Sequence, residues 1–407
     1  MVLNDVCELI VDCEHKTAPT QEFGYPSIRT PNIGRGRFIL DGVNRVSEDT
    51  YQLWTRRAVP RPGDLIMARE APVGNVAMIP MGLNPCLGQR TLLIRPDQSK
   101  IDPSFLNYYL NGPVVQAQIQ SKTNGATVAH LNMKDVRGMA LPELPPLPTQ
   151  QRIAGILSAY DELIESSQRR IKILEAMARG LYREWFVHFR FPGHENHPRV
   201  ASALGEIPQG WDVKAIKDFG KVVTGKTPSK TNADFFGDDV PFIKTPDMHG
   251  NIFVLDTNES LSIVGAKSQS KKTLPIGSIC VSCIGTIGVV SITTEECQTN
   301  QQINSVVLAK NEYREFLFLR LQDTKQALEN LGSNGATMGN VNKSKFESME
   351  VVAPIDALLA DFHRHTEPML KNILHLTRQI HNLRRTRDLL LPRLLSGQIN
   401  VEAAEHV

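Results

Sequence analysis

The chain has 407 residues, enough for two or three domains, because one hydrophobic core rarely grows beyond about 250–300 residues. Apolar residues make up 41% and charged residues 22%, which excludes a disordered or low-complexity chain. Lys and Arg total 45 against 43 Asp and Glu, so a nucleic-acid partner would have to be bound by locally arranged positive charge.

The N-terminal segment predicts a cytoplasmic protein. Asp5 and Glu8 lie where a signal peptide needs a basic stretch followed by an apolar run. No uncharged apolar stretch of about 18 residues occurs, and the mean hydropathy is −0.22, so we expect no membrane span. The six cysteines are too sparse for a disulfide scaffold and are interpreted as free thiols.

In chain order, β-rich segments alternate with segments of helical periodicity. Short β-type runs at 74–79 and 91–94 precede a cluster of prolines and then a helical segment. Similar runs at 279–282 and 287–292 precede a second helical segment. The predicted organisation is a globular domain (1–146), a helix (147–192), a linker (193–212), a second domain (213–354), a second helix (355–396) and a tail (397–407).

The two halves are copies of one plan. Tyr25-Pro-Ser-Ile-Arg-Thr-Pro returns as Val240-Pro-Phe-Ile-Lys-Thr-Pro, and Gly63 and Gly74 return as Gly277 and Gly288 with the same eleven-residue gap. Asn-Gly-Ala-Thr127 returns as Asn-Gly-Ala-Thr337. The matches keep their order at an offset of 210 to 215 residues, which indicates a duplication.

Both helical segments carry a heptad seam. From Ile153 to Trp185 ten positions alternate by fours and threes, and nine are apolar; the second seam, from Met369 to Leu394, has seven apolar positions of eight. Such long helices need a partner, and each copy supplies one to the other. Pro368 and Pro392 predict a kink near Arg364 and a break after Leu391. The residues expected in the helix–helix seam are Leu157, Ile164, Ile171, Leu174, Leu181, Ile373, Leu376, Ile380, Leu383 and Leu390.

Two motifs suggest other functions but lack their structural context. Gly220 to Thr227 matches a phosphate-binding loop, yet a short charged segment precedes it and Pro228 follows it, so a basic surface loop is favoured. Cys280 and Cys283 have metal-site spacing but too few further ligands, so strand alternation explains them better. We expect no metal site, and no catalytic constellation is evident.

Polar clusters that recur in both copies suit nucleic acid. Arg and Lys can pair with guanine, Gln and Asn with adenine, and Thr, Ser and Lys with phosphate. A single cluster of this kind is more often a solvated loop, and a shared fold could also preserve the pattern. The DNA-binding candidates in copy 1 are His15, Lys16, Thr17, Arg29, Thr30, Asn32, Gln89, Arg90, Thr127, His130 and Asn132, and Arg56, Arg57 and Arg61 form a further basic cluster. The candidates in copy 2 are Lys226, Thr227, Lys244, Thr245, Gln301, Gln302, Thr337, Asn340, Asn342 and Lys343.

Two similar but unequal readers in one chain predict a bipartite target. A pseudo-two-fold pair reads two half-sites at a fixed separation, and the half-sites differ because the copies differ in sequence. The fold class expected from the residues is α+β, with two β-rich domains and two long helices that pair with each other.

The segment from Leu144 to Leu157 (LPPLPTQQRIAGIL), the continuation to Phe186 and the Leu-Leu-Ser-Gly397 ending resemble the specificity subunit of type I restriction-modification systems. The resemblance covers essentially the whole chain. It implies that the two β-rich domains are target recognition domains separated by the two long helices, which pack as an antiparallel coiled coil. It implies double-stranded DNA and two modification (methyltransferase) subunits as partners, with or without restriction subunits, and no catalytic residues or cofactor on this chain. S-adenosylmethionine, ATP and Mg²⁺ would belong to the partner subunits. The second copy lacks the Pro-Pro-Leu motif, so the two ends need not dock a partner equally.

Two alternatives remain from the residues. The first is a stand-alone DNA-binding regulator that uses the same repeat and binds its bipartite site tightly without partners. The second is a nucleotide-dependent enzyme based on Lys226 and Thr227.

Overall fold

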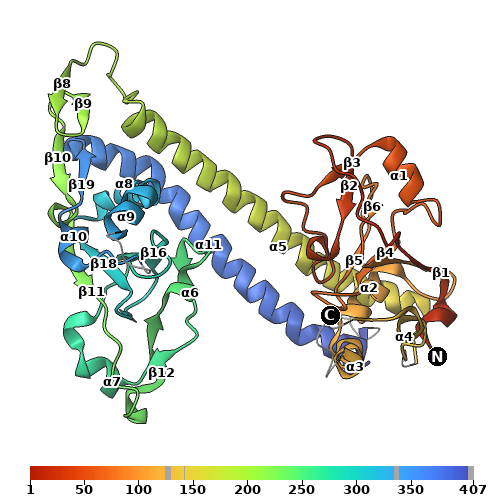
Figure 1. Ribbon diagram of the computed structural model, residues 1–407. Coiled ribbons are helices and arrows are strands. Elements are labelled where there is room, and N and C mark those ends of the chain that lie inside the picture. The colour runs from red at the N-terminus through yellow and green to blue at the C-terminus, as the bar shows by residue number, and fades with distance from the viewer. Residues whose placement is uncertain (124–129, 142, 334–338, 402–407) are drawn as a thin grey trace. The chain divides into compact units, whose positions relative to one another are not determined.

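The computed structural model describes residues 1–123, 130–141, 143–333 and 339–401. The chain divides into two compact units, unit 1 (Met1–Glu165 with Asn382–Val407) and unit 2 (Ser166–His381). Each unit combines small β-sheets with helices, and the helices α5 (Leu147–Tyr182) and α11 (Asp356–Leu395) contribute a segment to each (Figure 1). The fold class is α+β, as the sequence predicts.

The described residues of unit 1 form two sheets. The larger is antiparallel, with strand order β1 (Cys7–Asp12), β7 (Thr91–Pro96), β4 (Leu65–Ala68), β5 (Val76–Met78). The smaller has the order β3 (Arg45–Val46), β2 (Tyr25–Ile28), β6 (Cys86–Leu87), with β2 and β6 parallel. The helices of the domain are α1 (Glu48–Trp54), α2 (Pro103–Asn111), α3 (Pro113–Thr123) and α4 (Met133–Arg137), with 3-10 turns at Leu3–Val6 and Thr30–Asn32.

Unit 2 repeats this plan. Its larger sheet has the order β11 (Gly220–Thr224), β18 (Ile303–Leu308), β15 (Ile279–Ser282), β16 (Val290–Thr293), β13 (Phe253–Val254), and its smaller sheet has β14 (Ser260–Leu261), β12 (Phe236–Ile243), β17 (Gln298–Thr299). Two further pairs are β10 (Asp212–Ala215) with β19 (Glu350–Ala353) and β8 (Arg199–Ser202) with β9 (Gly205–Pro208). The helices are α6 (Thr245–Met248), α7 (Ile263–Ser268), α8 (Arg314–Asp323), α9 (Lys325–Gly332) and α10 (Lys343–Glu347). The sheet topology therefore confirms the duplication.

The repeated glycines show why the motif survives in both copies. Gly74 has a φ of +84° and its amide closes the β4–β5 turn on the Ala68 carbonyl; Gly288 has the same φ and closes the β15–β16 turn on Ser282. A Cβ at Gly74 would lie 2.8 Å from Ile119, and one at Gly288 2.6 Å from Lys325. Glycine therefore serves both the left-handed turn and the close approach of the following helix.

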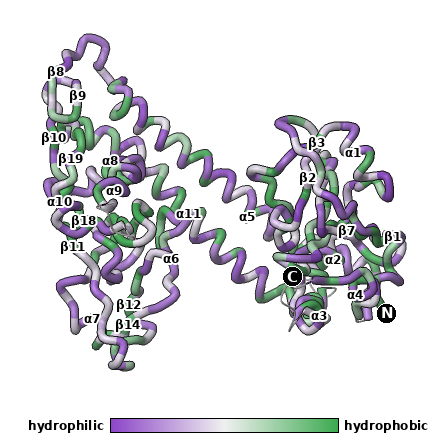
Figure 2. Tube along the Cα trace, in the orientation of Figure 1, coloured by the Kyte–Doolittle hydropathy of each residue, from purple (hydrophilic) through white to green (hydrophobic). Residues whose placement is uncertain are grey.

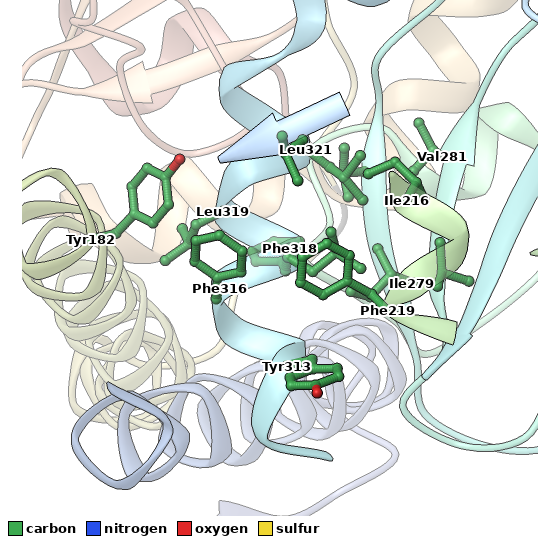
Figure 3. Packing of buried hydrophobic residues seen from close by; sticks show 14 of the residues in the cluster. Tyr182, Ile216, Phe219, Ile279, Val281, Tyr313, Phe316, Phe318, Leu319 and Leu321 are labelled. Atoms are coloured by element: carbon green, nitrogen blue, oxygen red, sulfur yellow. The ribbon is translucent and has the colours of Figure 1, made fainter. Parts of the chain in front are cut away.

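The core of each unit lies between its larger sheet and the helices. In unit 2 the fully buried rings of Phe316 and Phe219 lie beside Tyr182 of α5 and the strand residue Ile279 (Figure 3). In unit 1 the corresponding cluster joins Phe105 of α2 to Leu157 of α5. Each long helix is thus anchored by the core of the domain next to it.

The helix segments run antiparallel within each unit. In unit 1, Asp161 of α5 pairs with Arg387 of α11. Ile153, earlier in α5, and Leu394, later in α11, line the same groove. In unit 2, the Trp185 ring lies 5.7 Å from that of Phe362. Figure 2 shows hydrophobic and hydrophilic residues alternating along both helices, as a heptad pattern requires.

The expected break after Leu391 is wrong, because α11 continues to Leu395. A proline inside a helix costs about 3 kcal/mol, but burying one leucine side chain is worth about 1.5–3 kcal/mol. Leu394 is 2% exposed and Leu390, Leu391 and Leu395 pack against the same cluster, so packing on both sides of Pro392 holds the helix. The helix also runs through Pro368 without interruption, and the kink near Arg364 stays a prediction.

The expected seam residues differ in burial. Leu157 and Ile164 in unit 1 and Ile373, Leu376 and Ile380 in unit 2 are buried. The remaining five are half-buried: Ile171, Leu174, Leu181, Leu383 and Leu390. Within the described residues, no helix is long and apolar enough to span a membrane.

Candidate nucleic-acid interface

The polar candidates of unit 1 gather at one end of the larger sheet. The register pairs Asp12 with Leu92 and Ala68 with Thr91, so the last residues of β1 and β4 meet the first residues of β7. The segments 13–17, 69–70 and 88–90 leave the sheet there. We call this the polar end of unit 1; the polar end of unit 2 is the equivalent place at Thr224, Ser282 and Ile303.

One hydrogen bond recurs at both polar ends. The Thr17 hydroxyl donates to the Gln89 side chain at 3.4 Å, and the Thr227 hydroxyl donates to the Gln301 side chain at 2.6 Å. The two pairs join segments 72 and 74 residues apart in sequence. The structure thus brings together two pairs of candidates that the sequence placed in separate clusters.

A second contact fixes the lysine before each threonine. The Trp54 indole N–H donates to the Lys16 carbonyl at 3.4 Å, and the Gln269 side-chain amide donates to the Lys226 carbonyl at 2.8 Å. Both lysine side chains remain exposed. Each polar end therefore presents an exposed lysine on a backbone that is held in place.

The phosphate-loop interpretation of Gly220–Thr227 is excluded by this geometry. Gly220–Thr224 form strand β11, and the described stretch 225–232 contains no helix. The amides of Gly225 and Lys226 donate to the carbonyls of Ile303 and Thr299. A phosphate-binding loop needs free amides at a helix N-terminus, and these amides are occupied.

Unit 1 carries a charged network at its polar end that the sequence did not reveal. Glu70 accepts from His130 Nδ1 at 2.9 Å and pairs with Arg90 at 2.8 Å. Arg69 lies 3.0 Å from His130 Nε2 and pairs with Asp12 at 2.5 Å, and its Nε donates to the Leu131 carbonyl. The network has one carboxylate for each guanidinium.

The equivalent place in unit 2 is uncharged. The Arg69 amide donates to the Arg90 carbonyl, and the Cys283 amide donates to the Gln302 carbonyl, so Cys283 stands in the place of Arg69. Ile284 follows it where Glu70 follows Arg69. The Asn304 side chain accepts from Thr224 at 2.6 Å and donates to the Val341 carbonyl at 3.1 Å, which replaces the bond from Arg69 to Leu131.

Three asparagine candidates serve local structure. Asn132 and Asn342 accept the amides of Asp135 and Lys345 as N-caps of α4 and α10. Asn32 accepts the Arg29 amide and donates to the Ile39 carbonyl. Their side chains are thus engaged in holding turns.

The basic residues differ in how free they are. Lys244 forms an ion pair with Glu259, which lowers the pKa of that carboxyl, and Lys343 pairs with Glu347 at 3.1 Å. Arg56 and Arg57 both pair with Glu14 but remain more than two-fifths exposed. Arg29 is exposed and lies beside Gly88 at the polar end.

Other candidates are buried or fall outside the described residues. Thr30 and Thr245 are less than one-tenth exposed, and the Thr245 hydroxyl has no hydrogen-bond partner among the described residues. Asn340 is exposed and its backbone bridges to Ile284. Thr127 and Thr337 lie outside the residues that the structure describes.

One group at the polar end has metal-ligand chemistry. Ligand atoms of Asp12, Cys13 and His15 lie within 4.8 Å of one another. Arg69 already pairs with the Asp12 carboxylate, and burial raises the pKa of the Cys13 thiol, which disfavours the thiolate that a metal binds. These contacts argue against a metal centre there.

The sequence model of the type I restriction modification DNA specificity domain matches residues 1–176 and 208–357. The chain is 30% identical to the type I restriction enzyme HindI specificity subunit of Haemophilus influenzae, over 92% of this chain and 95% of that protein. It is 24% identical to the MjaIX specificity subunit of Methanocaldococcus jannaschii, over 90% of this chain and 84% of that protein.

A solved structure shares the fold. The S subunit of a type I restriction-modification system from M. genitalium superposes with a TM-score of 0.66 at 13% identity, over 97% of this chain and 95% of that one. The duplicated α+β domains, each attached to an antiparallel helix pair, define a two-domain DNA-specificity protein. The chain belongs to the type I restriction modification DNA specificity domain family.

Proposed function

We propose that this chain is the DNA specificity subunit of a type I restriction-modification complex, in which each polar end reads one half of a bipartite double-stranded target. The observation that carries the proposal is the repeated polar end, with the same threonine–glutamine bond beside an exposed lysine in both units. Thr and Lys can bind phosphate while Gln and Arg bind base edges, which is the division of labour that sequence readers use. The chain itself is non-catalytic.

Among the candidates, those that keep exposed polar atoms at the polar ends are the proposed DNA contacts. Five candidates act by supporting their loops: the helix caps Asn132 and Asn342, the turn residue Asn32, and the buried Thr30 and Thr245. The proposed contacts are His15, Lys16, Thr17, Arg29, Gln89, Arg90, Lys226, Thr227, Gln301, Gln302 and Asn340.

The long helices are the proposed docking surface for two modification subunits. Exposed apolar residues lie on α5 seven residues apart at Ile156 and Leu163 in unit 1, and four residues apart at Ile173 and Met177 in unit 2. Helical spacings of this kind put apolar side chains on one face, where a partner helix would cover them. S-adenosylmethionine, ATP and Mg²⁺ belong to the partner subunits.

A map of N6-methyladenine across the genome, with and without this gene, tests the function. We expect one bipartite motif to lose its methylation when the gene is deleted. If every motif keeps its methylation, and the isolated chain binds a bipartite site tightly, the stand-alone regulator replaces this proposal.

A second experiment tests the helices as a spacer. Inserting about four residues, roughly one helical turn, into both α5 and α11 should lengthen the unread spacer of the preferred target. The control is an insertion of the same length in the segment 193–198, which should leave the spacer unchanged. An unchanged spacer length after the helix insertions would contradict the proposal that the helices set the spacer.

A further inference from the structure

Arg90 and Gln302 occupy the same place in the two units. Each follows the glutamine that pairs with the repeated threonine, Thr17 or Thr227. The backbone carbonyl of each accepts from the amide of the first residue after strand β4 or β15, which is Arg69 or Cys283. The backbone carbonyl of that residue accepts a hydrogen bond from the amide of Leu131 in unit 1 at 3.0 Å, and from the amide of Val341 in unit 2 at 2.9 Å. The same three contacts therefore surround Arg90 and Gln302, although these two side chains differ in chemistry.

The Arg90 side chain is held but not covered. One of its terminal nitrogens pairs with Glu70 at 2.8 Å, while 57% of the side chain is exposed. Its φ of +67° lies in the left-handed region, which a residue with a Cβ adopts at a cost. A guanidinium fixed on one side by a carboxylate presents its remaining N–H groups in a set orientation, as bidentate recognition requires.

His130 in turn holds Glu70, and Arg69 holds His130. Arg69 can only donate, so His130 Nε2 accepts from it, and the ring proton on Nδ1 is donated to Glu70. Both ring nitrogens of His130 are therefore engaged inside the network. This makes His130 a positioning residue, although the sequence suggested a direct contact.

The balanced charges of this network favour contact with a base edge over contact with a phosphate. Glu70 and Asp12 offset Arg90 and Arg69 in the network, and the neutral tautomer of His130 adds no charge. A balanced cluster attracts a phosphate weakly, whereas its directed donors still suit a base edge. In unit 2 the side-chain oxygen Oε1 of Gln302 accepts from the Asn300 side-chain amide at 3.1 Å, and the Gln302 side chain is half-buried, so it too has a defined orientation.

We propose that Arg90 and Gln302 are equivalent base-reading residues, so that unit 1 reads guanine at the position where unit 2 reads adenine. The donors of an arginine match guanine O6 and N7, and the amide of a glutamine matches adenine N6 and N7. Glu70 and His130 position Arg90 for this contact. The inference rests on the proposed function and adds the base class at one position of each half-site.

The test measures the preferred target of the complex reconstituted with its modification subunits, from a library randomised in both half-sites. Arg90→Gln should reduce the preference for guanine at one position of the unit 1 half-site by about 5- to 150-fold, because a bidentate pair discriminates to that extent. The unit 2 half-site should not change. Gln302→Ala should reduce the preference for adenine at the matching position of the other half-site only.

Two further variants separate positioning from structure and from charge. Glu70→Gln should relax discrimination at the same base pair as Arg90→Gln, whereas a merely structural role would weaken every sequence alike. Lys100→Gln removes one positive charge beyond the opposite end of β7 and should leave both half-sites unchanged.

The outcomes distinguish the two proposals. If the unaltered complex selects no bipartite motif, the proposed function itself fails. If it selects one, but Arg90→Gln leaves the unit 1 half-site unchanged or lowers binding to all sequences equally, Arg90 is no base reader and this inference is overturned. If Arg90→Gln does not fold, Glu70→Gln and Gln302→Ala decide by the same criterion.

Discussion

The two units share a topology but hold their helices with different chemistry. In unit 1, Asp161 of α5 accepts from Tyr108 at 2.7 Å and pairs with Arg387 of α11 at 2.5 Å. In unit 2, the Phe186 ring lies 4.9 Å from Phe316 and 4.8 Å from Phe362. The duplicated fold has therefore kept strand order and turns, while the contacts that attach the helices differ: a Tyr–Asp–Arg group in unit 1, and an aromatic cluster beside the His363–Glu315 pair in unit 2.

The polar ends differ in the same way. The backbone hydrogen bonds coincide, but the charged Arg69 and Glu70 of unit 1 correspond to Cys283 and Ile284 of unit 2. Because the backbone is held by the same contacts in both units, the side chains at this place can change without altering the fold. A scaffold of this kind permits new specificity at an unchanged position.

The largest effect should come from the aromatic attachment. Phe316→Ala should lower the free energy of unfolding by about 3–5 kcal/mol, because the fully buried ring contacts Tyr182, Phe186 and Phe219. Phe105→Ala in unit 1 should fall lower in that range, since the single aromatic contact of Phe105 among the described residues is Tyr109. Urea unfolding followed by far-UV circular dichroism measures both. An equal loss would contradict the difference between the attachments.

The polar attachment should respond next. Arg387→Met should lower the free energy of unfolding by about 1.5–3 kcal/mol, because Asp161, with a side chain 13% exposed, loses its charged partner and retains the Tyr108 hydroxyl. The matched control is Arg384→Met, at an exposed position of the same helix. A loss equal to that of the control would show that the ion pair contributes nothing to this attachment.

The helix caps should have a smaller effect that is similar in both units. Asn132→Ala and Asn342→Ala should each lower stability by about 1 kcal/mol, because each removes the acceptor for one amide at a helix N-terminus. The preferred DNA target should stay the same. A changed base preference with unchanged stability would restore these asparagines as direct contacts.

The smallest expected difference between the units lies in thiol reactivity. Burial raises the pKa of Cys86 in unit 1 to about 12 and that of Cys283 in unit 2 to about 11. At pH 8 a thiol with a pKa of about 11 is ionised roughly once in a thousand molecules, so iodoacetamide should label both slowly. The rate should rise about tenfold per pH unit up to the pKa. Rapid labelling of Cys283 at pH 8, measured by mass spectrometry, would contradict its burial.

The sequence predicted the repeat better than the helix ends. Periodicity located both long helices because their apolar positions recur along the chain, as at Leu157 and Ile373. The same reasoning placed a break at Pro392, where the rule for an isolated helix fails because Leu394 is buried beside it. Local signals cannot report the packing that offsets the proline.

The candidate site was predicted by residue type more than by role. Matching of the two copies identified Thr17 and Thr227, and likewise Gln89 and Gln301, as candidates. The hydrogen bonds from each threonine to its glutamine became visible only in the fold. Glu70 was missed because an isolated glutamate in a turn carries no motif. Its partner His130 lies 60 residues away, a separation at which sequence spacing gives no information.

The sequence by itself determined the duplication, the α+β class, the helical segments and the family, because all of these are written as order and periodicity along the chain. The tertiary structure decided which polar side chains act together, since the larger sheet brings the ends of β1, β4 and β7 to one place. It also decided that Asn132 caps a helix, whereas Arg90 remains exposed and pairs with the carboxylate of Glu70. Those roles depend on distances between residues far apart in sequence, and only the folded chain sets them.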